Sequence, residues 1–283
     1  MSDKVVNGVQ GQANDFQVQA NNQGLTLYGY WRSSAAYRVR IALNLKGIDY
    51  QYVPVHLVKD GGQQHSEGYH QLNPSELVPT LVHDGFVLSQ SMAIIDYLES
   101  LNADVPLLPE FEELQLEEQQ SKELRWLVQS IAQDISMDIH PLNNLRVLQY
   151  LKGELGCTED QANKWYQHWI VTGFQSIEEK LERLDNIHIK HKLSIKHDHR
   201  IKHGQCIKHD QQPDNNSEGK VPAYALGAQP SLIDVCLIPQ VYNALRFEVD
   251  MSAYPKIMSI YEYANTQPAF ISALPENQSD ALN

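Results

Sequence analysis

The sequence predicts two structural units, a small mixed α/β sheet near the N-terminus and an all-helical domain after it. A strand–helix–strand pattern begins at Leu25, and two later apolar runs meet at Asp84-Gly85, a dipeptide typical of β-hairpin turns. Beyond these, residues 112–148 and 159–184 show helical periodicity with few strand signals. A strand–helix–strand unit followed by a hairpin and a helix implies a mixed sheet that carries helices.

The α/β unit begins with two expected strands, at residues 25–28 and 49–57, where apolar and aromatic side chains recur. Between them, apolar residues at helical spacing predict a helix from about 34 to 46, which Gly47 ends. The polar run 59–71, which contains a pair of glycines, predicts a loop with a short helix.

The second half of the α/β unit is expected to be a hairpin followed by a helix. Strands at 77–82 and 86–88 flank the turn, and an apolar helix follows at 92–101. Ser89 and Ser91 precede this helix. We expect one of them to be its N-cap, because a serine hydroxyl accepts a hydrogen bond from a first-turn N–H group.

Composition divides the chain further. Residues 1–24 are polar and rich in Asn and Gln, which predicts a flexible leader. We expect the α/β unit at 25–106, a linker at 107–112 and the helical domain at 113–280. Within the helical domain, an insertion is expected at about 187–222.

The insertion contains a repeat in which Ile-Lys-His recurs every six residues, and six of the 12 histidines of the chain lie within it. One hypothesis is a metal-binding tract, and the other is a tandem expansion in a loop that tolerates added residues. A spacing of six suits neither one face of a helix nor a compact tetrahedral site. The sequence therefore favours the loop expansion and predicts no metal site.

The bulk properties exclude several classes of partner. The chain has 283 residues and a formal net charge of −13, which argues against nucleic acid or an anionic membrane surface. No apolar run approaches the roughly 20 residues that a membrane span needs. The polar N-terminus lacks the apolar core of a signal peptide, so we expect a cytoplasmic location. The three cysteines are scattered and predict neither a disulfide framework nor a zinc site.

Ser33 and Ser34 are expected where the first strand leads into the first helix. The free N–H groups and the positive dipole end of a helix stabilise an anion at such a place, and a thiolate is an anion. The sequence has no cysteine at this turn, so any thiol has to arrive with a ligand. The alternative is that the two serines only cap the helix.

Two further turns suit a ligand. Proline cannot donate to a sheet ladder, so Pro79 exposes the backbone of Val78 to a peptide-like molecule, unless it only marks an edge strand. Gln90 and Ser91, at the start of a helix, suit a carboxylate or serve only as caps. All three turns can lie at one end of the sheet, where α/β proteins bind ligands.

Long blocks of the sequence, in consecutive order, carry a family resemblance. They are Tyr30–Leu43, Lys59–Gln64, Leu72–Pro74, Leu77–Leu81, Gln90–Leu98, Asp138–Leu148, Asp234–Val241 and Arg246–Asp250. These blocks resemble the zeta class of the glutathione transferase superfamily, and the resemblance covers roughly residues 25–186 and 222–280. A match of this length is far more specific than a short motif.

The resemblance implies a glutathione transferase fold, with a thioredoxin-like α/β N-terminal domain and an all-α C-terminal domain. It implies reduced glutathione as cofactor and a glutathione-dependent cis-trans isomerisation of maleylacetoacetate to fumarylacetoacetate in tyrosine and phenylalanine catabolism. The thiolate adds to the conjugated double bond, the bond rotates, and elimination gives the trans product. A homodimer is implied too, which pairs the N-terminal domain of one subunit with the helical domain of the other.

Three alternatives stay open. A maleylpyruvate isomerase of the gentisate route shares the mechanism and most motifs. A general glutathione transferase would conjugate electrophiles and release the product. A non-enzymatic binding protein is the third, and the intact set of glutathione-binding motifs argues against it.

The resemblance also assigns roles to individual residues. Ser33 would hydrogen-bond the thiolate with help from Ser34, and the backbone of Val78 would pair with the cysteinyl unit of glutathione. Gln90 and Ser91 would hold its γ-glutamyl end. Contacts with glutathione or the substrate are also implied for Gln64, His140 and Asn144.

Arg32 and Arg246 match arginines that related maleylpyruvate isomerases use for substrate carboxylates. Guanidinium groups suit bidentate carboxylate binding and stabilise developing negative charge, so a small diacid is the implied partner. From the residues alone, surface salt bridges are the alternative for both arginines.

The chain departs from the family pattern at Ala35, where many zeta-class proteins have a cysteine after the serine pair. Because the reacting thiol comes with the ligand, we expect isomerisation to survive this change. The Ser231-x-x-Asp234 pattern resembles the capping box of the family's core helix. It is intact, so we expect the fold to tolerate the insertion as an outward loop.

Overall fold

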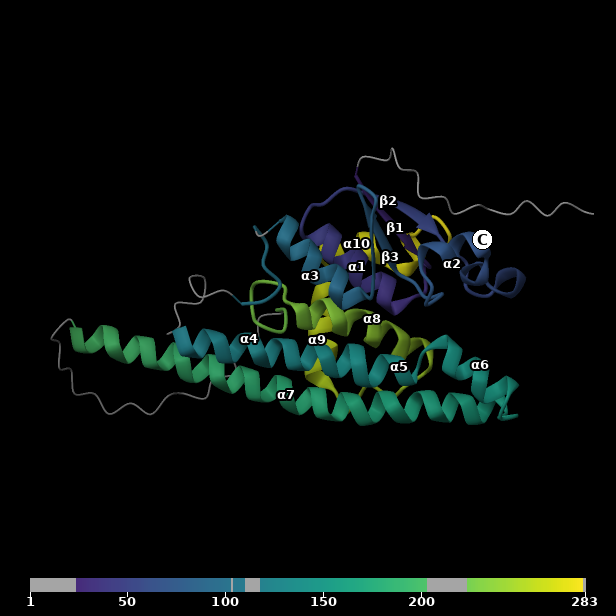
Figure 1. Ribbon diagram of the computed structural model, residues 1–283. Helices are drawn as coiled ribbons and strands as arrows, with labels where there is room; N and C mark the ends of the chain where they lie inside the picture. Colours follow the sequence, from purple (N-terminus) through teal and green to yellow (C-terminus); the bar gives the residue numbers. More distant parts are fainter. Residues whose placement is uncertain (1–23, 103, 110–117, 203–222, 282–283) are drawn as a thin grey trace, which may run out of the picture.

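Four strands form one mixed sheet in the order β2-β1-β3-β4 (Figure 1). β1 (Leu25–Gly29) pairs in parallel with β2 (Tyr50–Pro54) and antiparallel with β3 (Thr80–His83). β3 and β4 (Phe86–Ser89) form the predicted hairpin, whose two turn residues both have positive φ, 48° at Asp84 and 83° at Gly85. Positive φ at both positions is what an Asp-Gly turn accommodates, so the expected hairpin is confirmed.

The computed structural model describes residues 24–102, 104–109, 118–202 and 223–281, and for 186–202 the backbone alone. Residues 1–23 of the predicted leader 1–24, and residues 110–112 of the predicted linker 107–112, lie outside the described residues.

Helix α1 (Ser34–Leu45) follows β1 and is buried on every side. Every residue from Ala36 to Leu43 is buried, and the helix packs against α3 (Ser91–Leu101), α8 (Leu232–Arg246) and α10 (Pro268–Ala273). Its end is as predicted. Gly47 has a φ of 60° and lets the chain turn back, so that the N–H of Ile48 reaches the carbonyl of Leu43 at 3.0 Å.

Between β2 and β3 the chain forms two short 3-10 turns, η1 (Lys59–Gly61) and η2 (Gln63–His65), and then α2 (Glu67–Leu72), in agreement with the predicted loop and short helix. The expected N-cap of α3 is wrong. The cap is Gln90, with a φ of 73° and no side-chain capping bond, because Ser89 still pairs with Thr80 in the sheet and Ser91 is already helical.

The rest of the described chain is largely helical. Its elements are α4 (Glu118–Gln133), a π-helical turn (Asp134–Ile139), α5 (His140–Leu142), α6 (Leu145–Gly153), α7 (Glu159–Lys202), α8, α9 (Pro255–Ala264), α10 and the 3-10 turn η4 (Pro275–Asn277). The periodicity that the sequence shows up to Leu148 is thus interrupted twice, by the π-helical turn and by a turn at Asn143. In the described part of the chain, no helix is long and apolar enough to cross a bilayer.

Helix α7 corrects the prediction that residues from about 187 onward form an outward loop. The helix continues through the first part of the histidine-rich repeat to Lys202 and runs beside and past α4 (Figure 1). The stretch from Leu184 to Lys202 has no glycine or proline, so nothing in it ends the helix. Residues 203–222, the remainder of the predicted insertion, lie outside the described residues.

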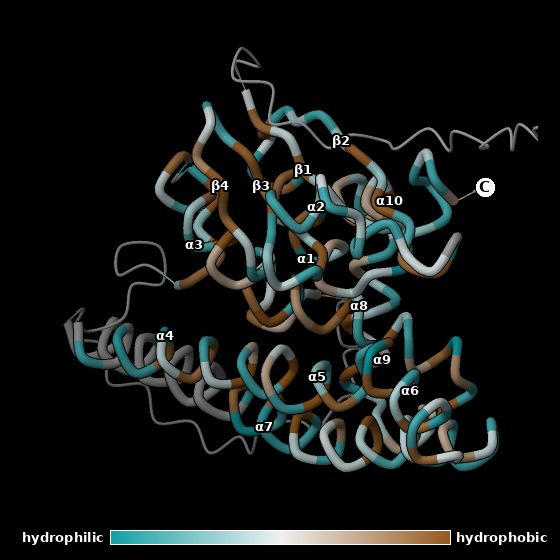
Figure 2. The backbone as a smooth tube through the Cα atoms, turned by 45° about the vertical axis from the view of Figure 1, so that its right-hand side comes forward, coloured by the Kyte–Doolittle hydropathy of each residue, from teal (hydrophilic) through white to brown (hydrophobic). Residues whose placement is uncertain are grey.

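The C-terminal segment returns to the sheet. In Figure 2 the sheet lies above the layer of long helices, and α10 lies on the side of the sheet. The Nε of Arg40 in α1 donates to the carbonyl of Ala273 at 3.1 Å, and the side-chain amide of Asn44 donates to Ala269 at 2.9 Å. The last described helix therefore packs on α1 rather than on the helical layer.

The capping box at the start of α8 joins several segments. Asp234 is fully buried and accepts bonds from the Ser231 N–H and hydroxyl, both at 2.7 Å, and from the Ala225 N–H at 2.8 Å. The N–H of Leu232 donates to the carbonyl of Leu107 at 2.7 Å, which ties the helix to the segment after α3. One carboxylate thus satisfies three buried donors.

We expect Asp234→Ala to lower the free energy of unfolding by about 3 kcal/mol, because it leaves buried donors without an acceptor. Urea denaturation followed by circular dichroism measures this. Asp160→Ala, which removes an exposed pair with Lys164 in the first turn of α7, is the control and should cost about 0.5 kcal/mol or less. Equal losses in the two variants would contradict the role assigned to Asp234.

Candidate functional site

A pocket of about 350 Å³ lies between the sheet and the helical layer. Eight of the ten predicted site residues line it: Arg32, Ser33, Ser34, Gln64, Val78, His140, Asn144 and Arg246. Gln90 and Ser91 are not among its lining residues. The lining also includes residues to which the sequence motifs assign no role, among them Tyr30, Asn143, Arg146, Tyr166 and Asn243.

The strand register explains why distant turns meet here. Tyr28 in β1 lies opposite Thr80 in β3, and Thr80 lies opposite Ser89 in β4. The chain segments next to these residues, at Tyr30, Val78 and Gln90, therefore leave the sheet at the same end. The predicted convergence of the three turns is confirmed.

Ser33 and Ser34 are placed differently at the start of α1. Ser33 is the N-cap, and its Oγ accepts from the N–H of Ala36 at 3.2 Å. Ser34 is buried, and its Oγ accepts from the side-chain amide of Asn243 in α8. Because each oxygen already accepts a bond, each hydroxyl proton remains able to donate, so capping and anion binding are compatible.

The turn that carries Arg32 is held by the C-terminal segment. The N–H of Trp31 donates to a carboxylate oxygen of Asp280 at 3.1 Å, and its carbonyl accepts from Arg40 at 3.1 Å. Arg40 is fully buried. The guanidinium of Arg32 lies 4.0 Å from the centre of the Trp31 ring, a cation–π contact. The sequence does not reveal the contact between Trp31 and Asp280, because the two residues lie far apart along the chain.

The segment before Val78 is also fixed from behind. The carbonyl of Leu77 accepts from the Tyr69 hydroxyl at 2.7 Å and from the Asn73 amide at 2.8 Å. The Val78–Pro79 peptide bond is cis. These contacts hold the backbone of Val78 where it lines the pocket.

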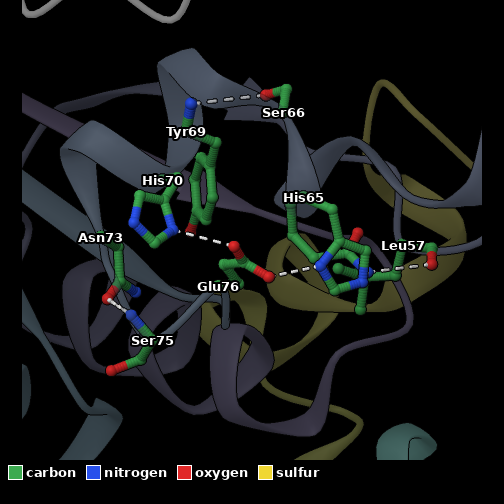
Figure 3. A network of polar contacts seen from close by, with 9 residues as sticks. Leu57, His65, Ser66, Tyr69, His70, Asn73, Ser75 and Glu76 are labelled. Carbon is green, nitrogen blue, oxygen red and sulfur yellow. Dashed lines mark hydrogen bonds and ion pairs between the residues drawn. The ribbon is translucent and has the colours of Figure 1, made fainter.

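Two histidines and a carboxylate brace the rim of the pocket (Figure 3). Glu76 contacts Nδ1 of His65 at 2.5 Å with one oxygen and Nδ1 of His70 at 2.8 Å with the other. These hydrogen bonds lower the pKa of Glu76. Glu76 and His65 both line the pocket, but the Glu76 carboxylate is hydrogen-bonded to the two imidazoles.

Gln64 is a buried amide with spare hydrogen-bonding capacity. Its Nε2 donates to the carbonyl of Leu57 at 3.4 Å and lies 2.9 Å from a ring nitrogen of His65, whereas its Oε1 has no partner among the described residues. The amide packs directly on Gly62, which has a φ of 102°. A Cβ at position 62 would collide with the amide, so glycine is required for this placement.

On the helical side, the π-helical turn places His140. Gly173 of α7 lies against the side chain of Ile139, in space that a Cβ would fill, so α7 can approach the turn closely. Burial of the His140 ring, with the nearby charges of Arg38 and Arg146, lowers its pKa to about 3. His140 is therefore neutral at physiological pH.

The two asparagines after His140 both line the pocket, but their side chains have different partners. Asn144 caps α6, with its Oδ1 accepting from the N–H of Arg146 at 3.1 Å. The neighbouring Asn143 is buried in the pocket lining, and both polar atoms of its side chain lack a partner among the described residues. Position in the motif could not separate the two, because only the local backbone decides which one caps the helix.

Three arginines line the pocket: Arg32, Arg146 and Arg246. All three are exposed, and none forms an ion pair with a described residue. Arg246 instead lies over the Phe247 ring at 4.8 Å. The surface salt bridges considered for Arg32 and Arg246 are thus not observed within the described residues. The guanidinium groups remain available to an anionic ligand.

Gln90 and Ser91 lie at the start of α3. Gln90 is exposed, and Ser91 is buried with its Oγ accepting from Arg38 at 3.1 Å. Within the described residues, no group of three or more His, Cys, Asp or Glu side chains is arranged to hold a metal ion.

Comparison with known proteins gives the family. Residues 23–100 match the family described as glutathione S-transferase, N-terminal domain. Over 257 residues the chain is 44% identical to a probable maleylacetoacetate isomerase from Vibrio cholerae, covering 91% of this chain and 98% of that protein. The chain belongs to the zeta-class glutathione transferase family. Residues 23–100 match the thioredoxin-like domain of that family, and the rest of the described chain is largely helical.

Solved structures agree. A holo maleylpyruvate isomerase, titled a bacterial glutathione S-transferase of the zeta class, superposes with a TM-score of 0.71 at 34% identity, over 90% of this chain and 99% of that one. The maleylacetoacetate isomerase of Methylobacterium extorquens, solved with malonate and glutathione, gives a TM-score of 0.69 at 32% identity, again over 90% and 99%.

The zeta-class pocket of this chain fits glutathione. Its volume lies in the range of small-molecule sites, and a tripeptide offers donors and acceptors along its length. The backbone of Val78 lines the pocket, as do Gln64 and Asn243, whose Oε1 and Oδ1 atoms have no partner among the described residues. The hydroxyls of Ser33 and Ser34 lie at the helix N-terminus, the place that suits a thiolate.

We expect the His140 imidazole to stay neutral from pH 5 to pH 8, because its pKa of about 3 lies below that whole range. Nitrogen-15 NMR of the histidine rings measures this, with the His140→Gln variant used to assign the signal. A His140 ring that gains a proton between pH 8 and pH 5 would refute the expectation.

Proposed function

We propose that this protein is a glutathione-dependent maleylacetoacetate isomerase, which converts maleylacetoacetate to fumarylacetoacetate. One observation carries the proposal: the serine-bearing N-terminus of α1 lines the same pocket as three arginines that form no ion pair with a described residue. A helix N-terminus with hydroxyls suits a thiolate, and free guanidinium groups suit a substrate with two carboxylates. The M. extorquens relative was solved with malonate, itself a dicarboxylate, together with glutathione.

Glutathione supplies the thiolate that adds to the cis double bond and later leaves. Ser33 donates its hydroxyl proton to the sulfur and keeps it ionised, while Ser34, oriented by Asn243, donates from the next position. The backbone of Val78 and the amide of Gln64 hold the peptide part of glutathione. Contacts from the helical side are assigned to His140 and Asn144, with Asn143 added by its unpartnered amide.

Arg32 and Arg246 hold the substrate carboxylates, and Arg146 is a third candidate that the structure adds. Guanidinium groups there also stabilise the negative charge that builds up next to the double bond during the reaction. Neutral His140 adds no positive charge and can donate one hydrogen bond and accept another.

A second candidate substrate is maleylpyruvate, because the holo structure titled maleylpyruvate isomerase has the same fold. Both substrates are small diacids with a cis double bond, so the three arginines suit either. The cytoplasmic location and the role in tyrosine and phenylalanine catabolism are predictions that follow from the main proposal.

The proposal is tested by following the absorbance of maleylacetoacetate and of maleylpyruvate, each with and without reduced glutathione. We expect fast loss of maleylacetoacetate only when glutathione is present. A clear preference for maleylpyruvate would move the protein to the second candidate. Glutathione binding without turnover of either substrate would refute both.

Ser33→Ala separates catalysis from capping. We expect kcat/KM to fall at least about 100-fold, because the thiolate loses a donor, while stability falls by only about 1 kcal/mol for the lost cap. Thr158→Ala is the matched control, because Thr158 accepts from the N–H of Gln161 at 3.3 Å at the start of α7, away from the pocket. That variant should lose similar stability and keep full activity. Full activity in Ser33→Ala would remove Ser33 from its assigned role.

The proposal includes a homodimer. Exposed apolar side chains occur on both halves: Phe86 on β4 has 53% of its surface exposed, and Trp126 on α4 has 65%. Apolar groups exposed on each half fit an assembly that pairs the sheet unit of one subunit with the helical unit of the other.

We expect analytical ultracentrifugation at micromolar concentration to give twice the mass of one chain, and Trp126→Glu to give single chains, because a carboxylate cannot be buried in an apolar interface. Tyr150→Glu is the control, since Tyr150 on α6 is 58% exposed and is not assigned to the interface. A native protein of one-chain mass would contradict the dimer.

A further inference from the structure

Arg38, in the middle of α1, is a buried cation with few partners. Its exposed fraction is 2%. Its Nη1 donates to the Oγ of Ser91 at 3.1 Å, while Nε and Nη2 have no hydrogen-bond partner among the described residues. Within the same residues, no carboxylate forms an ion pair with it.

The groups that face Arg38 do not balance its charge. Cys236 of α8 is a buried thiol whose pKa burial raises to about 11, so it is neutral at physiological pH. His140 is neutral as well, since its pKa lies near 3. An unpaired buried charge costs several kcal/mol, so a protein that keeps one has a use for it. The described residues supply no counter-charge, which points to an anionic ligand.

The bond to Ser91 limits what that serine can do. A guanidinium can only donate, so the Ser91 oxygen has to accept, and its own proton is left for another acceptor. Ser91 is also the first residue of α3, an 11-residue helix whose N-terminal N–H groups and dipole favour negative charge. A hydroxyl proton, a helix N-terminus and a buried cation therefore act at one place.

This place adjoins the glutathione pocket. Ser91 follows β4 at the end of the sheet from which Tyr30 and Val78 enter the pocket, as the pairing of Tyr28 with Thr80 and of Thr80 with Ser89 requires. His140, which the charge of Arg38 influences, lines the pocket from the other side.

We propose that Arg38 is a positioning residue for glutathione, which fixes the Ser91 hydroxyl as a donor and supplies the buried counter-charge for the α-carboxylate of the γ-glutamyl unit. This inference rests on the proposed use of glutathione and goes beyond it by assigning a role to a side chain that lies outside the pocket lining. Arg38 acts through Ser91 and through the electrostatic attraction of its positive charge for the carboxylate, not by contact with the reacting atoms.

The first test uses the native protein and calorimetric titration with two probes. One is glutathione, and the other is glutathione with the glutamyl α-carboxylate replaced by a carboxamide. We expect glutathione to bind at least about tenfold more tightly, as expected for the loss of a hydrogen bond to a charged group. Equal Kd values would overturn the proposal without any variant.

The second test asks whether Arg38 causes that preference. Arg38→Met removes the charge and the donor at similar length, and we expect the preference for the carboxylate to shrink to about twofold or less. Arg40→Met is the matched control, because Arg40 is equally buried on the same helix but binds carbonyl groups of Trp31 and Ala273. It should weaken both probes by the same factor. If Arg38→Met lowered the affinity for both probes by the same factor, Arg38 would have a structural role only.

A double-mutant cycle with Ser91→Ala tests whether Arg38 acts on glutathione through the Ser91 hydroxyl. If Arg38 acts partly through Ser91, Arg38→Met costs less glutathione affinity in the Ser91→Ala background than in the native one. Fully additive losses would overturn the positioning role.

Failure of the proposed function is a separate outcome, since a protein that binds neither probe is not a glutathione enzyme. A protein that isomerises the diacid but shows no carboxylate preference refutes Arg38 alone.

Discussion

The burial of α1 on all sides is the constraint on which the rest of the structure depends. Its residues from Ala36 to Leu43 are exposed by 2% or less, because α3, α8 and α10 pack around a helix that already lies beside the sheet. Its N-terminus is therefore held firmly, and this end carries Ser33 and Ser34 into the pocket. The same burial gives Arg38 and Arg40 their strength as donors, since a hydrogen bond is electrostatically stronger where water is excluded.

The pocket is shaped largely by residues that do not line it. Asp280 and Arg40 hold the Trp31 backbone, Tyr69 and Asn73 hold the carbonyl before Val78, and Gly173 lets α7 close on the π-helical turn. A site supported in this way is preorganised, because its groups lose little freedom when a ligand arrives. Several polar atoms in the lining keep no partner within the described chain, which suits a ligand with many hydrogen bonds.

Local charge in the pocket opposes the charge of the whole molecule. The chain carries a net −13, yet three arginines face the pocket, Arg38 lies behind it, and Glu76 is engaged by two histidines. Overall repulsion disfavours polyanions such as nucleic acids, while a local positive field attracts a small dianion. Neutral His140 fits this arrangement, because nearby positive charges disfavour a further one.

The sequence by itself determined the order of elements, the hairpin at Asp84-Gly85, the end of α1 at Gly47 and the turns that converge, because these depend on local backbone preferences and side-chain period. It also carried the family, through long ordered motifs. It did not determine where α7 ends, which residue caps α3, or that Asn143, not Asn144, has a buried side-chain amide without a partner among the described residues. Only the tertiary structure decided the partners of Ser34, Trp31 and Arg38, since Asn243, Asp280 and Ser91 lie 209, 249 and 53 residues away along the chain. Such contacts depend on how α1 is buried between the sheet and the helices, and no local preference encodes that packing.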